Sequence, residues 1–409
     1  MHETDRVEQL FRGYSGRIFM LIAMAVLVTN LGRQVLPPLL PTILDDLVIS
    51  TAAAGIAFTA MRVAYALMQY PSGRIADVVS RQLAIMLGLL ILLLGFGLLT
   101  VTGAYPLFAL SMILIGIGAA FFFVSERVLL SDLFVEKRGR AFGVNSAFSM
   151  LGGILAAGLA VIVLTVGPWQ LAFFPVLLLL LALGFGFHVV SQEPYRFDRL
   201  RAAHPQQGEL RATIGRVFGT SEIRWLVIAY TLIIFVWEGV LAFLPTYLYV
   251  TKGFTPAIAG GGFAALFAVG IVVQPVSGTI SDWWDRRVVA GLATVLSILG
   301  LSLLLVSTRL TLVVVGIILY AAGLMAFTPV MQAYLLDRFP EASKGGDLGA
   351  FKTIYEGLSG FGPAYVGITA GLIGFSWSFG GFVLCLLVSG TIIFGLHFRS
   401  NDSNHVEID

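Results

Sequence analysis

Long apolar segments recur along the whole chain and are separated by short polar connections. The segment at residues 83–99 is typical, because almost every side chain in it is apolar. A helix needs about 20 such residues to cross about 30 Å of hydrocarbon, whereas a strand of a membrane barrel alternates polar and apolar positions. The pattern therefore predicts a bundle of membrane-spanning helices.

Twelve segments of this kind can be recognised, and one longer polar stretch divides them into two sets of six. The expected spans are residues 18–44, 52–73, 82–102, 106–132, 141–165, 169–190, 225–250, 257–281, 288–307, 310–336, 347–373 and 376–398. We expect an all-α membrane protein with a cytoplasmic N-terminal tail (1–17), an N-terminal six-helix bundle (18–190), a cytoplasmic central loop (191–224), a C-terminal six-helix bundle (225–398) and a cytoplasmic C-terminal tail (399–409).

The composition agrees with a membrane protein. Hydrophobic residues make up 58% of the chain and charged residues 12%, which is about half the charged fraction of a soluble domain. The expected N-terminal tail is polar and mixed in charge, so we expect no cleavable signal. Cys385 is the single cysteine and the five histidines lack ligand spacing, so we expect no disulfide, no metal and no cofactor.

The basic residues are distributed unevenly between the two sets of loops. Of 25 Lys and Arg, nineteen fall in the two tails and the even-numbered loops, and only Lys252 and Arg309 fall in the opposite loops. Cytoplasmic loops carry the excess of positive charge in membrane proteins. We therefore expect a multi-pass protein of the inner cell membrane with both termini in the cytoplasm.

Several motifs occur twice, with an almost constant offset between the two copies. Residues 40–44, LPTIL, return as LPTYL at 244–248. Residues 72–77, SGRIAD, return as SGTISD at 277–282. A constant offset indicates a duplicated chain, and hence two six-helix bundles in parallel repeat. Transporters built in this way hold their substrate near the midplane, at the interface of the repeats.

The duplicated segment includes a longer motif. Residues 73–82, GRIADVVSRQ, resemble the signature G-x-x-x-D-x-x-x-R-[RK] of the major facilitator superfamily, and residues 278–287, GTISDWWDRR, repeat it in register. The resemblance covers residues 18–398 and implies a secondary transporter with a gate on its cytoplasmic side. It assigns the gate to Gly73, Asp77, Arg81, Gly278, Asp282 and Arg286. The alternative is that these are interfacial charges that only set the topology.

Two finer resemblances favour anion transport. Residues 62–65, RVAY, are similar to the second-helix arginine segment of nitrate/nitrite porters, but Phe267 stands where those porters have a second arginine, which argues against nitrate itself. Residues 125–127, SER, are similar to the organic anion:proton symporter branch, whose first-helix arginine matches Arg33. That branch often has an acid before this arginine, and here Gly32 takes its place.

Charged residues inside the expected spans are candidates for substrate binding, because an ionised group at the bilayer centre costs at least about 2.5 kcal/mol unless it faces a cavity or a partner. Arg33 lies deep in the first span, and Arg62 lies near the middle of the second. The expected substrate-binding residues are Arg33, Arg62, Asn30, Gln34, Tyr65, Arg127, Gln332 and Tyr355. The alternative for Arg33 is a buried structural ion pair.

Three carboxylates in the spans are candidates for proton coupling: Glu238, Glu126 and Glu356. Burial makes the charged form of a carboxylate costly, which can bring proton exchange into the physiological range. The alternative for Glu238 is a fixed counter-ion of Arg33 or Arg62. The alternative for Glu126 and its neighbour Arg127 is an interhelical salt bridge near the interface. The alternative for Glu356 is neutralisation by Lys352, four residues earlier on the same helix.

The arginines of the N-terminal half would make a positive cavity wall, which concentrates anions. Our first hypothesis is therefore a proton-coupled transporter of a small anionic metabolite. The alternative is efflux of amphipathic drug-like compounds by proton antiport, which is a weaker match because Met112 stands where such antiporters have an arginine. We find no nucleotide-binding loop or nucleophile–base pair, so we expect neither an enzyme nor a nucleic-acid partner. The expected partners are the substrate, the proton and the lipid bilayer, and we expect a monomer.

Overall fold

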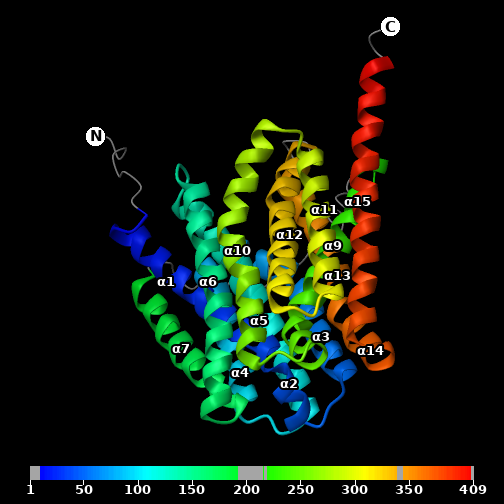
Figure 1. Cartoon of the computed structure of the whole chain (residues 1–409). Coiled ribbons are helices and arrows are strands. Elements are labelled where there is room, and N and C mark those ends of the chain that lie inside the picture. The colour runs from blue at the N-terminus through cyan, green and yellow to red at the C-terminus, as the bar shows by residue number, and fades with distance from the viewer. Residues whose placement is uncertain (1–9, 192–214, 216–218, 339–343, 407–409) are drawn as a thin grey trace, which may run out of the picture. The chain divides into compact units, whose positions relative to one another are not determined.

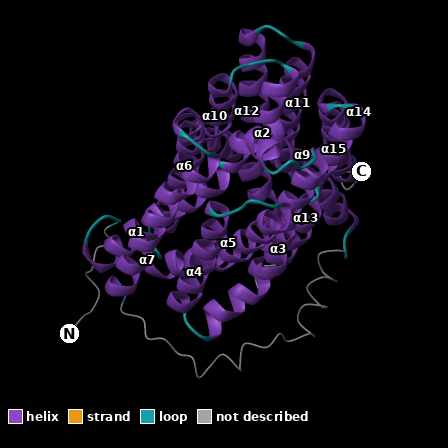
Figure 2. Cartoon of the chain, turned by 90° about the horizontal axis from the view of Figure 1, so that it is seen from below, coloured by secondary structure: helices purple, strands orange, loops and turns teal. Residues whose placement is uncertain are grey.

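The computed structural model describes residues 10–191, 215, 219–338 and 344–406 (Figure 1). Within these ranges, the side chains at 77, 78, 336, 344–348 and 398–406 are outside the description. Every regular element of the described residues is a helix (Figure 2). Residues 1–9 and 407–409 of the expected tails and most of the expected central loop, 191–224, lie outside the described residues, whereas α15 continues as helix through 399–406 of the expected C-terminal tail.

The helices follow one another with short connections. In the first half of the chain they are α1 (Gly13–Gln34), α2 (Leu36–Asp46), α3 (Thr51–Val78), α4 (Arg81–Thr100), α5 (Tyr105–Leu133), α6 (Arg138–Val166), the short 3-10 turn η1 (Trp169–Ala172) and α7 (Phe173–Val190). In the second half they are α9 (Ser221–Thr246), the π-helical turn η3 (Tyr247–Thr251), α10 (Pro256–Trp283), α11 (Arg286–Val306), α12 (Leu310–Arg338), α13 (Lys344–Ser359), α14 (Gly362–Ile373) and α15 (Phe375–Val406).

Eleven helical segments of the described chain are long and apolar enough to cross a membrane. The remaining expected span, 347–373, is divided into α13 and α14, which have 16 and 12 residues. Gly360 lies at the break, and Pro363 lies in the first turn of α14, where its missing N–H leaves no helix bond unmade. The two short helices together occupy the place of one span in the chain.

The bounds of the helices preserve the offset found in the sequence. Helices α3, α4 and α5 begin at residues 51, 81 and 105, and α10, α11 and α12 begin at residues 256, 286 and 310. The three pairs of starting positions are separated by the same interval along the chain, and so are the ends of α3 and α10 and the ends of α5 and α12. The second, third and fourth spans of the two halves therefore match helix by helix, as the repeated motifs predict.

Glycines at equivalent positions let equivalent helices of the two halves approach closely. A Cβ atom at Gly118 would lie 2.7 Å from the backbone nitrogen of Leu92, where α5 meets α4. A Cβ atom at Gly323 would collide with the carbonyl oxygen of Ala293, where α12 meets α11. Helices in lipid associate through such close backbone packing, because the hydrophobic effect gives them no drive to associate.

The described residues divide into two compact units by their contacts. Unit 1 contains residues 10–47 and 63–191, and unit 2 contains residues 48–62 and the described chain from 215 onward. Helix α3 therefore contributes its first part to unit 2 and its second part to unit 1.

The first part of α3 packs against α14 within unit 2. The Thr51 hydroxyl donates a hydrogen bond to the carbonyl oxygen of Gly367 at 2.9 Å. Two turns further along α3, the backbone N–H of Ala364 donates to the Thr59 hydroxyl at 3.0 Å. Between them, a Cβ atom at Gly55 would lie only 2.5 Å from the backbone of α14. Small residues on both helices thus bring the two backbones into contact.

Candidate substrate and proton site

An ion pair inside unit 2 joins α3 to α9. The guanidinium of Arg62 contacts the carboxylate of Glu238, and their side chains are 18% and 10% exposed. Glycines on neighbouring turns make room for this arrangement. A Cβ atom at Gly360 would lie 3.0 Å from Cβ of Arg62, and one at Gly239 would collide with the ring of Phe382. Both charged side chains are therefore held by closely packed backbone.

The Arg62–Glu238 pair answers one question that the sequence left open. Glu238 has a cationic partner, and that partner is Arg62. Taking two charges out of water is costly, and the mutual attraction of the pair offsets this cost only when the geometry is good. The contact therefore gives each of the two charged side chains an opposite charge as its partner.

Arg33 lies in unit 1, in the last turn of α1, and is 7% exposed. Its guanidinium carbon is 5.8 Å from the centre of the Tyr65 ring and 5.6 Å from the centre of the Phe123 ring. Aromatic faces attract a cation through their quadrupole. The two rings therefore hold the guanidinium in position without cancelling its charge.

The residues expected beside Arg33 take part in the packing of α1 against α6. The side-chain amide of Asn30 donates to the Ser149 hydroxyl at 3.0 Å and to the carbonyl oxygen of Val26 at 3.1 Å. Gln34 is buried, with 9% exposure. The amide nitrogen of Asn30 is thus occupied by contacts within unit 1.

Glu126 of α5 is a buried carboxylate in unit 1, with 1% exposure. The side-chain amide of Asn145, on α6, donates to its two oxygens at 3.2 and 3.4 Å. Arg127 lies next to it, with Nε 3.9 Å from the nearer oxygen, but its side chain is 52% exposed. Glu126 therefore has a buried neutral amide as a close partner and a more distant, exposed cation.

The candidates on α12 and α13 lie in unit 2. Lys352 and Glu356 form an i, i+4 ion pair at 3.3 Å, with both side chains about one-fifth exposed. The Tyr355 ring lies 4.5 Å from the ring of Tyr230 on α9. Gln332 is exposed on α12. The structure therefore joins Glu356 to Lys352 and Tyr355 to the aromatic core of unit 2.

Equivalent ion pairs occur at the two gating motifs. Arg81 contacts Asp132 at 2.7 Å, and Arg286, the counterpart of Arg81 in the repeat, contacts Asp337. Arg286 also lies 3.9 Å from Asp282 of its own motif. Each half thus ties the start of its third span to the end of its fourth.

The other residues of the gating motifs lie just before these arginines. Gly73 and Gly278 are in α3 and α10, the helices that precede each motif arginine. The side chain of Asp77 lies outside the described residues. The contacts of the first motif carboxylate therefore stay a prediction.

The repeat, the duplicated motif and the duplicated ion pairs agree with a comparison with protein families. The model of the Major Facilitator Superfamily matches residues 22–288 and 263–408. The chain belongs to this superfamily. It is therefore a multi-pass membrane transporter, and its fold is the two-bundle fold of that superfamily.

Relatives within the superfamily differ in what their names say they transport. Multidrug resistance protein 2 of Bacillus subtilis (strain 168) is 24% identical over 389 residues, which cover 92% of this chain and 94% of that protein. The probable sulfoacetate transporter SauU of Cupriavidus necator is 24% identical over 267 residues, which cover 60% of each chain.

Solved structures of superfamily members share the fold at low identity. A bacterial homologue of the human lysosomal transporter Spinster, in an inward-facing and unoccupied conformation, has a TM-score of 0.79 at 17% identity and covers 94% of this chain and 97% of its own. A D-xylose-proton symporter has a TM-score of 0.75 at 15% identity and covers 93% and 97%. These structures support the fold alone.

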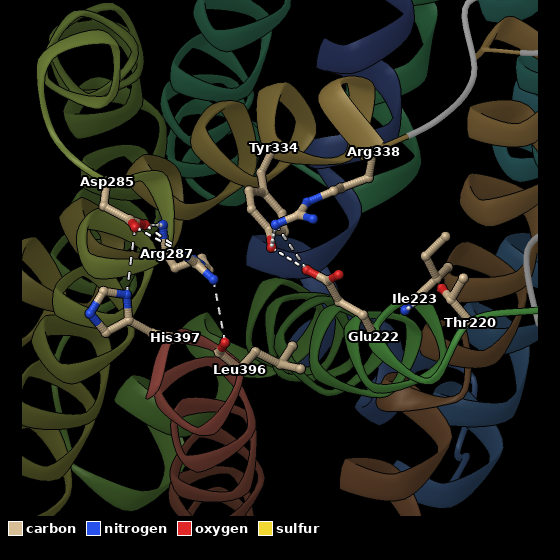
Figure 3. A network of polar contacts seen from close by, with 9 residues as sticks. All are labelled: Thr220, Glu222, Ile223, Asp285, Arg287, Tyr334, Arg338, Leu396 and His397. Atoms are coloured by element: carbon tan, nitrogen blue, oxygen red, sulfur yellow. Dashed lines mark hydrogen bonds and ion pairs between the residues drawn. The ribbon is translucent and has the colours of Figure 1, made fainter. Parts of the chain in front are cut away.

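A polar network joins four helices at the end of unit 2 that contains the second superfamily motif (Figure 3). Glu222 of α9 accepts a hydrogen bond from Tyr334 of α12 and pairs with Arg338 at 3.3 Å. Arg287 pairs with Asp285 at 3.0 Å and donates to a backbone carbonyl oxygen of α15 at 3.3 Å. These contacts therefore tie α9 to α12 and α11 to α15.

Sequence reasoning missed several partners of the candidate residues. Phe123 lies in a run of three phenylalanines, and nothing in the sequence distinguishes it from its neighbours. Asn145 is a buried amide in an otherwise apolar span, and its position in that span was a usable signal. Asp132 and Asp337 could have been found from the repeat, because they are equivalent positions, as are the arginines that they contact.

Proposed function

We propose that this protein is a secondary transporter that moves a small organic anion together with protons across the cell membrane, with both termini in the cytoplasm. The observation that carries the proposal is the ion pair between the half-buried Arg62 and the buried Glu238. An anionic substrate offers Arg62 the same kind of group that Glu238 offers, and a guanidinium binds carboxylate or sulfonate through two parallel N–H bonds. Substrate and Glu238 therefore compete for one cation.

This competition provides a route to coupling. When the substrate takes Arg62, the carboxylate of Glu238 loses its counter-ion in a place with 8% exposure. Burial disfavours a lone charge, so the freed carboxylate takes up a proton. Binding of one anion thereby brings one proton with it, and the loaded site is no more negative than the empty one.

Arg33 supports the choice of an anion. Its guanidinium lies against the rings of Tyr65 and Phe123, which attract a cation and leave its positive charge in place. A positive side chain in a water-filled cavity raises the local concentration of anions. The related sulfoacetate transporter, by its name, carries an anion with both a carboxylate and a sulfonate, and sulfoacetate is therefore a suitable first test substrate.

The test is uptake of sulfoacetate into proteoliposomes containing the purified protein, with a proton gradient imposed from outside. We expect Arg62→Gln and Arg33→Gln each to reduce uptake at least about tenfold, as expected when a charged hydrogen-bonding partner of a substrate is removed. Arg309→Gln is the matched control, because Arg309 is exposed and outside the site. Thermal unfolding verifies that each variant is folded. Normal uptake by both site variants would contradict the proposal.

The second candidate function is efflux of amphipathic compounds by proton antiport. It is favoured by the similarity to Multidrug resistance protein 2, which extends over 94% of that protein. In this case Arg33 is only an internal structural charge, while Glu238 still exchanges the proton. Efflux of ethidium that survives Arg33→Gln but is abolished by Glu238→Gln would favour the second function over the first.

A further inference from the structure

The hydroxyl of Tyr320 has no hydrogen-bond partner among the described residues, although the residue is completely buried. Tyr320 lies on α12, in unit 2. A buried hydroxyl that makes no hydrogen bond lowers the stability of the fold, and such groups in native proteins call for an explanation. A ligand, or a side chain in a second position, would remove this cost.

The backbone at Tyr320 is fixed by close packing against α11. A Cβ atom at Gly300 would collide with the backbone nitrogen of Tyr320. On the same side, the Ser297 hydroxyl donates to the carbonyl oxygen of Tyr320 at 3.4 Å. Because α12 cannot move closer to α11 here, we expect the partner of the hydroxyl to be a ligand or a side chain that comes to it.

Helix geometry places Glu238 at the level of Tyr320. Helices α9 and α12 are the first and fourth of four consecutive spans joined by short turns, so they run in opposite directions. They touch where the Tyr230 hydroxyl donates to the carbonyl oxygen of Thr328 at 3.2 Å. Glu238 lies two turns after Tyr230, and Tyr320 lies two turns before Thr328. Both positions are therefore displaced by a rise of about 12 Å in the same direction from the point of contact.

The level match agrees with the electrostatics of the site. Glu238 lies close enough to Tyr320 for its charge to act on the buried hydroxyl. In the structure, the same carboxylate contacts Arg62 of α3. Glu238 is therefore paired with the Arg62 guanidinium and lies at the level of a hydroxyl that makes no hydrogen bond within the described chain.

We propose that the Tyr320 hydroxyl is the second position of the Glu238 carboxyl group, which moves there when an anion occupies Arg62. This inference rests on the proposed function. Tyr320 acts as a positioning residue: its O–H donates a hydrogen bond to the freed carboxylate. A proton from water then binds the carboxylate oxygen and forms the acid, and Tyr320 keeps its own proton throughout.

The hydrogen bond from Tyr320 would help Glu238 to release its proton during the transport cycle. A lone buried carboxylate binds its proton too strongly to release it, because burial disfavours the charged form. A hydrogen bond to the charged form is stronger than one to the neutral form, so the Tyr320 hydroxyl favours release. Glu238 can then return to Arg62 once the substrate has left.

Charged and polar groups on the helices packed against α9 belong in the interpretation of any pH profile. Arg62 of α3 contacts Glu238 itself. The others are Tyr320 of α12, the Lys352–Glu356 pair of α13 and Tyr365 of α14, whose hydroxyl donates to the carbonyl oxygen of Ser378. Helices α10 and α15 present the rings of Phe267 and Phe382 near Trp237 and Gly239.

The experiment frees Glu238 without any substrate, by the substitution Arg62→Gln. The protonated carboxyl band of Glu238 is followed by infrared spectroscopy of the protein in lipid as a function of pH, and it is assigned as the band that Glu238→Gln abolishes. Adding Tyr320→Phe is expected to raise the midpoint of the titration by about one pH unit and to move the band to higher wavenumber, because one hydrogen bond to the carboxyl is lost.

Tyr230→Phe in the same Arg62→Gln background is the matched control. It removes another buried hydroxyl of unit 2, which already has Thr328 as its partner. This control should leave the Glu238 band and its midpoint unchanged. If Arg62→Gln is too unstable to purify, Arg62→Met keeps most of the side-chain volume and replaces it.

An unchanged midpoint and band position on adding Tyr320→Phe would overturn the inference. The spectroscopy needs no substrate, so its outcome is separate from that of the transport assay. Absence of sulfoacetate uptake by the wild type would count against the proposed function. The infrared band of the protonated Glu238 carboxyl would still show whether Glu238 reaches Tyr320.

Discussion

Lys252 is one of the two basic residues that the charge pattern places in loops outside the cell, and it has a structural role there. Its ammonium group donates to the carbonyl oxygens of Leu305 and Ser307 at 2.8 and 2.7 Å, where α11 ends. It also lies 5.5 Å from the centre of the Tyr247 ring. A cation at the C-terminus of a helix satisfies carbonyl groups that have no partner within the helix.

We therefore expect Lys252→Met to lower the free energy of unfolding by about 1–2 kcal/mol, since two hydrogen bonds from a charged donor are lost. The measurement is thermal unfolding of the purified protein in detergent. Arg309→Met is the matched control, because Arg309 is the exposed basic residue of the next loop on that side. Equal unfolding temperatures for the wild type and Lys252→Met would show that these hydrogen bonds add no stability.

For single residues, the sequence could predict which charged side chains lie inside the membrane spans, but not which of these side chains contact one another. Hydropathy identifies Arg62 and Glu238 because a charge in an apolar segment is conspicuous. Their contact depends on how α3 packs beside α9, and this packing is decided by small residues such as Gly360 and Gly239. Glycines are frequent in membrane helices, so their presence alone does not indicate a partner.

Among the elements, the eleventh expected span shows the limit of hydropathy. The segment is apolar enough to be recognised, but hydropathy contains no information on backbone continuity. Its division into α13 and α14 follows from glycine and proline between Gly360 and Pro363, which weaken a helix locally. The other helix boundaries were easier to predict, because α3, α4 and α5 return with the same offset in α10, α11 and α12.

The network at the ends of α9, α11, α12 and α15 predicts a dependence on pH. Burial alone would raise the pKa of the Asp285 carboxyl, but the hydrogen bonds and the charge of Arg287 lower it below its usual 3.8. His397 lies 3.6 Å away and adds to this effect when it is protonated. A lowered folded pKa stabilises the fold above the unfolded pKa, and this stabilisation is lost as the pH falls through the folded value.

Asp285→Asn should accordingly be less stable than the wild type at neutral pH and should lose less stability on acidification below about pH 4. The measurement is the unfolding temperature of both proteins across this range. Asp45→Asn is the control, because Asp45 is an exposed carboxylate of unit 1. Parallel curves for the wild type and Asp285→Asn would contradict the prediction.

For the whole molecule, the sequence predicts both the duplication and a chemical difference between the halves, but it does not predict the contacts of the residues that differ. The repeated motifs and the ion pairs of Arg81 and Arg286 occupy equivalent positions in the two halves. The site residues do not, because Phe267 occupies the position equivalent to Arg62. On the proposed function, the transport site therefore depends on departures from the repeat, and each departure has to be located by its contacts.

The contact of α3 with α14 gives a prediction at this scale. A Cβ atom at Gly367 would collide with the carbonyl oxygen of Thr51, so Gly367→Leu should force the two helices apart. We expect a cysteine introduced at Thr59, in a Cys385→Ser background, to react with a maleimide about tenfold faster in Gly367→Leu, because overpacking costs about 1–3 kcal/mol. Thr59 is 7% exposed in the closed contact.

Gly380→Leu is the control for this experiment, because a Cβ atom at Gly380 meets nothing within 4 Å. Reaction rates that do not differ between Gly367→Leu and the control would mean that the α3–α14 contact tolerates the added volume. Faster reaction combined with reduced uptake of sulfoacetate would connect this contact to the transport cycle.

Helix α3 is continuous from Thr51 to Val78, yet the change from one unit to the other falls between Arg62 and Val63. Sharp bends in helices arise at proline, at glycine or at a bulge, and residues 61–64 contain neither proline nor glycine. The backbone is therefore regular helix at the point where the contacts change, and Arg62 is the last residue of α3 that belongs to unit 2. On the proposed function, an anion held by Arg62 would bind to a helix whose next residue already belongs to unit 1.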